Sequence, residues 1–258
     1  MGKLNIHIEF LGTGTSQGVP VIACDCPVCN STDKRDKRLR SSLFIDTGGQ
    51  HIVIDCGPDF RQQMLRIGLK RLDAIILTHE HADHILGLDD IRAFNWVQKK
   101  PTDIYAEKRV VESVKRVFNY VFSENKYPGV PKMDIHIIEN KPFKIGNVDI
   151  LPIRGLHYNL PVLGYRIGSF AYLTDMKTIT KEEKQKLLEL DVLVVNALRK
   201  EIHKAHFNLQ EALDLIAEVK PKQAYLTHVA HMMGFYSEEN KLLPKNVSFA
   251  YDGLSLDI

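Results

Sequence analysis

Apolar positions along the chain follow two spacings, one typical of strands and one typical of helices. Short runs of apolar and β-branched residues predict strands over 4–11, 42–46, 51–55, 72–77, 134–138, 143–145, 148–153, 163–167, 169–174, 192–195, 223–227, 247–251 and 254–256. Apolar residues three or four positions apart predict helices over 60–68, 85–98, 107–121, 181–190 and 209–219. Strands come first in each half of the chain, roughly 1–140 and 141–258, with helices interspersed. This order predicts an α/β fold of two mixed sheets face to face with helices outside.

The composition indicates one domain over residues 1–258. The chain is 44% hydrophobic and 26% charged, which is enough for a single sizeable core. Its net charge of +2 gives no overall attraction to nucleic acid or membrane. The first residues lack a hydrophobic secretion segment, and no apolar stretch approaches the roughly 20 residues that span a bilayer. We therefore expect a cytoplasmic protein with no membrane contact.

Metal-ligand residue types are concentrated directly after the predicted strand 72–77. His79, His81, Asp83 and His84 fall within six positions. Imidazoles are scarce in proteins, and together with carboxylates they suit zinc, manganese or iron. A strand end is a rigid platform, and the loop after it can turn these side chains toward one point. The segment therefore predicts a metal centre.

Three further ligand types follow predicted strands later in the chain. His157, Asp175 and His228 each come shortly after a strand end. The tripeptide Leu-Thr-His occurs at 77–79 and again at 226–228, which indicates the same strand-to-ligand construction in both halves. Any one of these residues alone is more often an ordinary polar side chain than a ligand. Their order along the chain makes them candidates.

The order H-x-H-x-D-H, His, Asp, His resembles the ligand pattern of the metallo-β-lactamase superfamily. That superfamily is known for an αββα sandwich with a one- or two-metal site at one edge of the sheets. The resemblance implies two divalent ions, for which zinc, manganese and iron remain open. One ion would be held by His79, His81 and His157 and the other by Asp83, His84 and His228, with Asp175 bridging them. A water bridging two such ions would lose a proton near neutral pH and become a hydroxide nucleophile.

Asp55 lies at another predicted strand end, just before Gly57 and Pro58. The superfamily often has an aspartate there that orients a ligand loop or a ligand histidine. The alternative is an aspartate that only forms the turn. The sequence leaves both interpretations open.

His206 comes just before a predicted helix that has a capping signal. Asn208 is placed to cap the helix 209–219, and Glu211 completes a capping box. The positive end of a helix suits phosphate, and a histidine there could protonate a leaving alkoxide. The segment resembles the histidine-before-helix motif of the phosphodiesterase branch of the superfamily, which implies a catalytic role for His206. His203 either supports this site or lies on the surface.

A second metal site is indicated by three cysteines in a C-x-C-x-x-C cluster, Cys24, Cys26 and Cys29. Tetrahedral zinc needs a fourth ligand, and His231 could supply it. PhnP-like enzymes carry a structural zinc of three cysteines and one histidine, and the pattern here is similar. Such a closed site would hold loops in place without chemistry. Cys56 stands apart and is expected to pack in the core.

The PhnP-like resemblance covers about residues 9–231 and rests on segments 11–16, 78–84, 163–166 and 226–231 together with the cysteine cluster. It implies a metal-dependent phosphodiesterase that acts on a small anionic phosphodiester, cyclic ones included. Asp83, besides ligating metal, and His206 would be its catalytic residues. The superfamily often dimerises, so a homodimer is expected.

Three rival functions remain open from the sequence. A tRNA 3′-processing endonuclease would bind nucleic acid through a long protruding arm, and the chain has no glycine-proline-rich insertion of that kind. An acyl hydrolase for thioesters or β-lactams would need an acyl-recognition device, for which no motif is found. A metal-binding protein without turnover is the third. The basic run 34–40 is either a solvated loop or an attraction for an anionic substrate.

Overall fold

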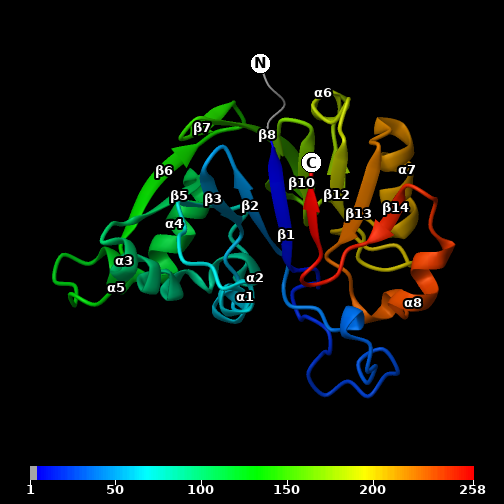
Figure 1. Ribbon diagram of the computed structural model, residues 1–258, viewed down its shortest axis with the longest axis horizontal. Coiled ribbons are helices and arrows are strands. Elements are labelled where there is room, and N and C mark those ends of the chain that lie inside the picture. Colours follow the sequence, from blue (N-terminus) through cyan, green and yellow to red (C-terminus); the bar gives the residue numbers. More distant parts are fainter. Residues whose placement is uncertain (1–4) are drawn as a thin grey trace.

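The computed structural model describes residues 5–258, which form two sheets packed face to face (Figure 1). The first sheet has the strand order β15-β1-β2-β3-β4-β5-β6. Its strands are β1 (Ile6–Gly12), β2 (Ser42–Thr47), β3 (Gln50–Ile54), β4 (Ala74–Ile76), β5 (Thr102–Glu107), β6 (Met133–Ile138) and β15 (Ser255–Asp257). From β3 to β6 neighbouring strands run parallel, and the others pair antiparallel.

The second sheet has the order β11-β8-β9-β10-β12-β13-β14, and β7 pairs with β8 outside this order. Its strands are β7 (Phe143–Ile145), β8 (Val148–His157), β9 (Leu160–Ile167), β10 (Phe170–Leu173), β11 (Thr178–Ile179), β12 (Val192–Asn196), β13 (Gln223–Thr227) and β14 (Val247–Phe249). From β10 to β14 neighbouring strands run parallel. Each half of the chain therefore builds one sheet, except that β15 returns to pair with β1.

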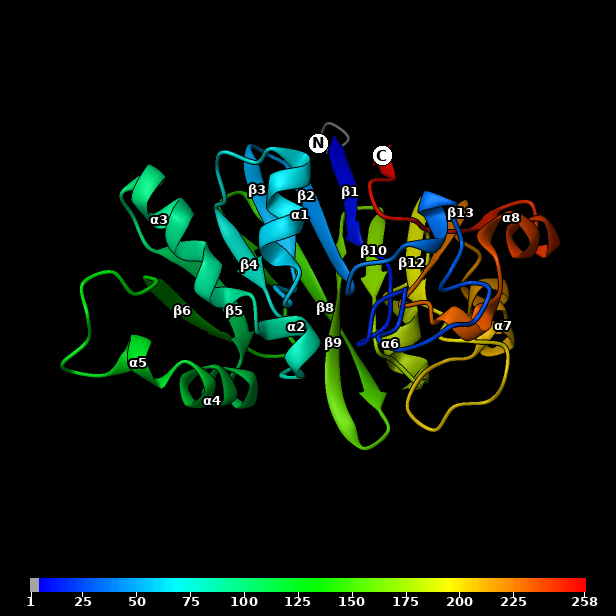
Figure 2. The same cartoon turned by 90° about the horizontal axis from the view of Figure 1, so that it is seen from below.

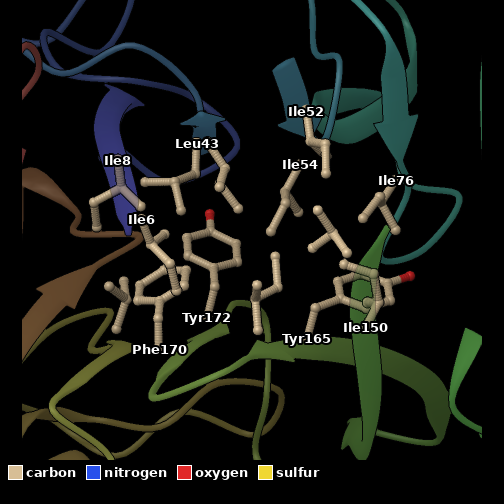
Figure 3. Packing of buried hydrophobic residues seen from close by; sticks show 14 of the residues in the cluster. Ile6, Ile8, Leu43, Ile52, Ile54, Ile76, Ile150, Tyr165, Phe170 and Tyr172 are labelled. Carbon is tan, nitrogen blue, oxygen red and sulfur yellow. The ribbon is translucent and has the colours of Figure 1, made fainter. Parts of the chain in front are cut away.

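The space between the sheets is filled by alternate residues of the facing strands, as the two-residue period of a strand requires. In β2, Leu43 and Ile45 face this core, whereas Phe44 faces the outer helices. Figure 3 shows the isoleucines of the first sheet packed against the rings of Tyr165 and Tyr172 from the second. Burial of each large apolar side chain contributes about 1.5–3 kcal/mol, so this layer is the main stabilising contact between the two halves.

Helices cover the outer face of each sheet and complete the αββα sandwich (Figure 2). The first sheet carries α1 (Phe60–Ile67), α3 (Arg92–Gln98) and α4 (Lys108–Val117), and the second carries α6 (Lys181–Gln185) and α7 (Leu209–Val219). Three short helices are α2 (Ala82–Ile85), α5 (Asn119–Phe122) and α8 (Tyr236–Glu239). The predicted fold class, α/β with two mixed sheets face to face, is confirmed.

Some elements differ in length from the predictions. The helix predicted over 85–98 is broken into a helical turn, a 3₁₀ turn (Leu88–Ile91) and α3, because Gly87 is pressed against the chain at Gly57. The hairpin of β8 and β9 extends much further than its apolar pattern, so that His157 ends β8. The strand predicted at the C-terminus forms as β15, but it belongs to the first sheet.

Within residues 5–258, no helix has both the length and the apolar character needed to cross a membrane. The expected cytoplasmic location and homodimer stay predictions.

Two glycines allow the segment that carries the predicted metal ligands to lie directly against the end of β3. A methyl group on Gly57 would lie 2.0 Å from the carbonyl oxygen of Asp83, and one on Gly87 would lie 2.0 Å from that of Gly57. The backbone N–H of Cys56 donates to the carbonyl oxygen of His84, at 2.7 Å. This close approach fixes the helical turn that bears Asp83 and His84.

We expect Gly57→Ala to lower the free energy of unfolding of the metal-free protein by about 3 kcal/mol, because the added methyl must displace backbone. Gly49→Ala is the matched control, since an added Cβ there meets nothing within 4 Å among residues 5–258 and the change meets only the strain of positive φ, about 1 kcal/mol. Denaturant titration measures both. Equal losses for the two variants would contradict the close-approach argument.

Candidate active site

The predicted ligands meet at one edge of the two sheets because parallel strands present their carboxyl ends on the same side. His79 follows β4, Asp175 follows β10 and His228 follows β13. Asp55, Asp175 and His228 have φ angles of +63°, +55° and +56°, a backbone conformation that residues other than glycine rarely adopt. Strained backbone of this kind clusters at functional sites. The strain was not predictable from the sequence.

The first group of ligand types consists of His79, His81 and His157. The Nδ1 atom of His79 lies 3.0 Å from the hydroxyl of Thr78, which leaves Nε2 to face Nδ1 of His81 at 3.0 Å. The ring of His157 lies 5.0 Å from that of His81 and 5.7 Å from that of His79. The structure thus places these three predicted rings beside one another.

The second group consists of Asp83, His84, Asp175 and His228, whose ligand atoms lie within 4.8 Å of one another. Nε2 of His84 is 3.1 Å from Asp83 and 3.2 Å from Asp175. Nε2 of His228 is 3.2 Å from the other oxygen of Asp175. Asp83 and His84 reach the group from the helical turn α2, whereas the sequence suggested an extended loop for the whole segment.

Hydrogen bonds behind the histidines fix which ring nitrogen faces the site. Nδ1 of His84 donates to Asp55 at 2.6 Å, and Asp55 also accepts the backbone N–H of Thr78 at 2.8 Å. Nδ1 of His157 donates to the carbonyl oxygen of Ala205 at 2.8 Å. In both rings Nε2 is left to point inward, as a ligand histidine requires. The orienting interpretation of Asp55 is therefore favoured over that of a simple turn residue.

Ser41 fixes the orientation of the His228 ring in the same way. The hydroxyl of Ser41 donates to the carbonyl oxygen of Gly14 at 2.9 Å and lies 3.2 Å from Nδ1 of His228. Because its proton is used on Gly14, the hydroxyl accepts from Nδ1–H, and Nε2 again faces the site. Sequence reasoning missed Ser41, since a serine beside a predicted strand carries no signal of this kind.

The electrostatics of the group favour a bound cation. Burial lowers the pKa of His79 and of His228, so both rings are neutral. Burial would lower the pKa of His84 as well, but Asp83, Asp55 and Asp175 raise it well above its usual range. Burial likewise would raise the pKa of Asp175, but neighbouring histidines hold it well below normal. Converging carboxylates are thus ionised in a buried place that needs positive charge.

Unpaired atoms support the same fit. Nε2 of His84, Nε2 of His228 and Nδ1 of His206 are buried and have no hydrogen-bond partner among residues 5–258. Buried polar atoms are normally hydrogen-bonded, and these three face the same space from different elements. The neutral imidazoles of His79 and His228 and the ionised carboxylates are also the protonation states that divalent zinc, manganese or iron bind. The residues present therefore fit a metal centre.

His206 is buried beside both groups. Its ring lies 4.4 Å from that of His157 and 4.9 Å from that of His228, and its Nδ1 is 3.6 Å from Asp175. Burial lowers the pKa of His206 to about 3. The ring of His203 lies 5.0 Å away, in contact with His206 rather than alone on the surface.

The predicted capping box at the start of α7 is present, formed by Asn208 and Glu211. The sequence suggested that the N-terminal end of this helix would suit phosphate, but its amides are used within the chain. The N–H of Glu211 donates to Asn208, and the N–H of Leu209 donates to the carbonyl oxygen of Arg199. With these amides in use, the group that faces the site is His206 itself and not the end of the helix.

The four residues of the predicted structural site also lie together. Nδ1 of His231 is 3.4 Å from the sulfur of Cys24, 3.3 Å from that of Cys26 and 3.5 Å from that of Cys29. The backbone N–H of Cys29 lowers the pKa of Cys26 to about 6, which favours the thiolate that binds metal, whereas burial raises the pKa of Cys29 to about 11. Cys56 is fully buried in the cluster under the first sheet, as expected.

Two arginines of the basic run 34–40 are held by contacts with the body of the fold. Arg38 is buried and donates to Thr13 and to the carbonyl oxygen of Ala250. Arg40 pairs with Asp59 at 3.0 Å. These contacts fasten the cysteine-bearing segment to the body of the fold.

Arg109, at the start of α4, is a residue that sequence reasoning missed. Its guanidinium donates to the carboxylate of Glu80 and to the carbonyl oxygen of Pro161. It therefore ties the segment that carries His79 and His81 to the β8–β9 hairpin. A single arginine in an amphipathic helix gives no sequence signal for such a link.

Comparison with known proteins agrees with this geometry. The family model described as the Beta-lactamase superfamily domain matches residues 50–229. A crystal structure described as a new diphosphatase from the PhnP family is 37% identical, with a TM-score of 0.93, and the match covers 99% of this chain and 98% of that one.

Two curated relatives carry other names. An octanoyltransferase of Porphyromonas gingivalis is 42% identical over 248 residues, which cover 95% of this chain and 50% of that protein. The chain therefore spans about half the length of that relative. A ribonuclease Z of Methanosarcina acetivorans is 30% identical over 168 residues, which cover 63% of this chain and 48% of that protein. The sandwich, the His/Asp site at its edge and these matches lead to one assignment: the chain belongs to the metallo-β-lactamase superfamily of hydrolases, in its PhnP-like branch.

Proposed function

We propose that this chain is a binuclear metal-dependent phosphodiesterase that acts on a small anionic phosphodiester, cyclic ones included. The observation that carries the proposal is the position of Asp175. It lies within 4.8 Å of ligand atoms in two overlapping groups, one with Asp83, His84 and His228 and the other with His157 and His206. A carboxylate with histidines on both sides suits a bridge between two cations.

The proposed ligands are divided between the two ions. His79, His81 and His157 would hold one, and Asp83, His84 and His228 would hold the other, with Asp175 shared. Two bound divalent ions would lower the pKa of water and neutralise charge on phosphoryl oxygens. The second group has the larger negative charge, with two carboxylates, so it would hold its cation under the stronger attraction.

Residues of the chain supply the rest of the chemistry. Asp83, which is close to His84 and at the edge of the buried group, orients the attacking water and accepts its proton. His206 donates a hydrogen bond to the leaving oxygen or to a phosphoryl oxygen from the opposite side. The hydrogen bonds of Asp55, Ser41 and the carbonyl of Ala205 hold the ligand rings in place while this occurs.

The cysteine cluster would hold a separate structural zinc. Three sulfurs and one nitrogen complete a tetrahedral shell, which leaves no open position for a substrate. His228 and His231 lie in the same short segment after β13. A zinc at the cysteines would therefore steady a loop that carries an active-site ligand.

The names of the relatives bear on the substrate in different ways. The PhnP-family structure is named a diphosphatase, which is a phosphoryl-transfer activity. It matches this chain along nearly its whole length. The octanoyltransferase name belongs to a protein twice as long, so that activity needs no counterpart here. We therefore favour phosphoryl chemistry over acyl transfer.

Ribonuclease Z activity is the second candidate, because a relative of that name is 30% identical over part of the chain. A gel-shift with tRNA at moderate salt separates the two, since a small-substrate enzyme should not retain tRNA under those conditions.

The direct test is a substrate panel after reconstitution with Mn²⁺ or Zn²⁺. We expect turnover of bis-p-nitrophenyl phosphate and of 2′,3′-cyclic nucleotides, and none of thioesters or nitrocefin. Thioester turnover without phosphodiester turnover would overturn the proposal.

Asp55→Asn should weaken active-site metal binding about 10–100-fold, because the amide cannot accept from both His84 and Thr78 as the carboxylate does. Asp73→Asn, which changes a carboxylate away from the site, is the control. Metal content after dialysis against a graded chelator measures the difference. Unchanged metal retention in Asp55→Asn would show that His84 does not need this partner.

Cys29→Ala should remove one equivalent of zinc and lower the melting temperature, while the active-site ions stay bound. Cys56→Ala is the matched control, because Cys56 is not part of the group of Cys24, Cys26, Cys29 and His231, and the variant should retain the full metal content. Elemental analysis of both variants decides. A full complement of zinc in Cys29→Ala would mean that the cluster binds no metal.

His206→Ala should reduce kcat about 100-fold or more while the metal content stays the same, because the residue acts on the substrate and not on the ions. His7→Ala, on β1 and in none of the groups of possible metal ligands within residues 5–258, should leave both unchanged. The measurement is kcat and metal content of both variants and the wild type, taken on the same preparations. Loss of metal in His206→Ala would identify His206 as a ligand instead.

A further inference from the structure

The turn between β8 and β9 places two exposed side chains beside the proposed metal site. His157 and Leu160 are the last paired residues of the hairpin, so Tyr158 and Asn159 form a two-residue turn. Both are exposed, and the Tyr158 side chain has 61% of its area accessible to solvent. Figure 2 shows the hairpin projecting past the sheets at the edge where the site lies.

Tyr158 occupies a position where a bulky side chain is costly. Its φ angle is +55°, in the left-handed region, and the first position of such a two-residue turn favours glycine. Bulky residues in this conformation are uncommon, and they persist at ligand clamps where the surroundings hold them. Within the described part of the chain the ring has no aromatic or hydrogen-bond partner that would account for it.

The turn is held firmly on both sides. Arg109 donates to the carbonyl oxygen of Pro161 just after the turn. Before it, the N–H of Lys177 donates to the carbonyl oxygen of Leu156 at 2.7 Å, and His157 donates to Ala205 at 2.8 Å. The Tyr158 ring is therefore presented from a fixed backbone rather than from a loose loop, which lowers the entropy lost when a ligand binds.

A pocket of about 440 Å³ lies directly against this turn. It is lined by His81, His157, Tyr158, Asn159 and Leu160. Two of these residues, His81 and His157, are proposed metal ligands, so the pocket opens onto the first ion position. Its volume lies in the range of small-molecule sites. It combines an aromatic ring, an apolar side chain and one amide.

We propose that Tyr158 and Asn159 form a base-recognition site and that the substrate is a nucleotide phosphodiester. This rests on the proposed phosphodiesterase function. The nucleobase stacks on the ring of Tyr158, and the amide of Asn159 hydrogen-bonds to its edge, while the phosphodiester lies over the metal ligands. Stacking accepts every base because each has a flat π face, so the site selects nucleotides in general rather than one base.

Turnover of two matched substrates tests the proposal. Adenosine 2′,3′-cyclic phosphate carries a base, and methyl β-D-ribofuranoside 2′,3′-cyclic phosphate has the same reacting group without one. We expect wild-type kcat/KM to be about tenfold higher for the nucleotide, equivalent to about 1.4 kcal/mol. Tyr158→Ala should abolish this ratio, mainly through KM, and Tyr158→Phe should restore it. Tyr127→Ala, an exposed tyrosine on another loop, is the control and should keep the wild-type ratio.

Binding measured by calorimetry separates this proposal from the proposed function. AMP should bind more tightly than ribose 5-phosphate, and Tyr158→Ala should remove the difference. If no phosphodiester is turned over but AMP binding depends on Tyr158, the base site stands and the phosphodiesterase function fails. If cyclic phosphates are hydrolysed with the same ratio in wild type and Tyr158→Ala, and AMP binding is unchanged, the base site is wrong.

Discussion

The structure depends on the burial of several carboxylates within one small volume. Asp55, Asp83 and Asp175 all lie against His84, and each is less than one-tenth exposed. Burial of unpaired charge is very costly. His84 has a raised pKa, and it faces two carboxylates, Asp83 and Asp175, whose pKa values are held low. Divalent cations would supply the missing positive charge, and the neutral histidines around the group are arranged as their ligands. Bound cations would thus stabilise this edge of the fold as well as supply its chemistry.

The rest of the fold can be understood as support for that arrangement. The two sheets bring strand ends from both halves of the chain to one edge, and the apolar layer between them fixes their separation (Figure 3). Gly57 allows the turn bearing Asp83 to lie against β3. The cysteine cluster contacts His231 in the segment after β13, and the basic run 34–40 contacts Asp59 and Ala250. The exposed tip of the β8–β9 hairpin lies beside the site.

Much of this was predictable from the sequence, and the remainder was not for physical reasons. The strand-then-ligand pattern at 77–79 and 226–228 identifies candidate ligands, because strand ends are set by local apolar runs. Ser41, Arg109 and the turn at Tyr158 carry no local signal, since their roles come from contacts with distant residues. The long β8–β9 hairpin was underestimated because its outer part is paired by backbone hydrogen bonds and not by an apolar pattern. The helix predicted over 85–98 is broken by a contact with Gly57 that only the folded chain contains.

The most direct test of the central claim is anomalous diffraction from crystals of the zinc-loaded protein, collected on both sides of the zinc absorption edge. The account predicts two peaks on either side of the Asp175 carboxylate, each with three histidine or aspartate neighbours of its own, and a third peak among the cysteines. A single peak at the cysteines, with the Asp175 region empty under saturating zinc, would contradict it.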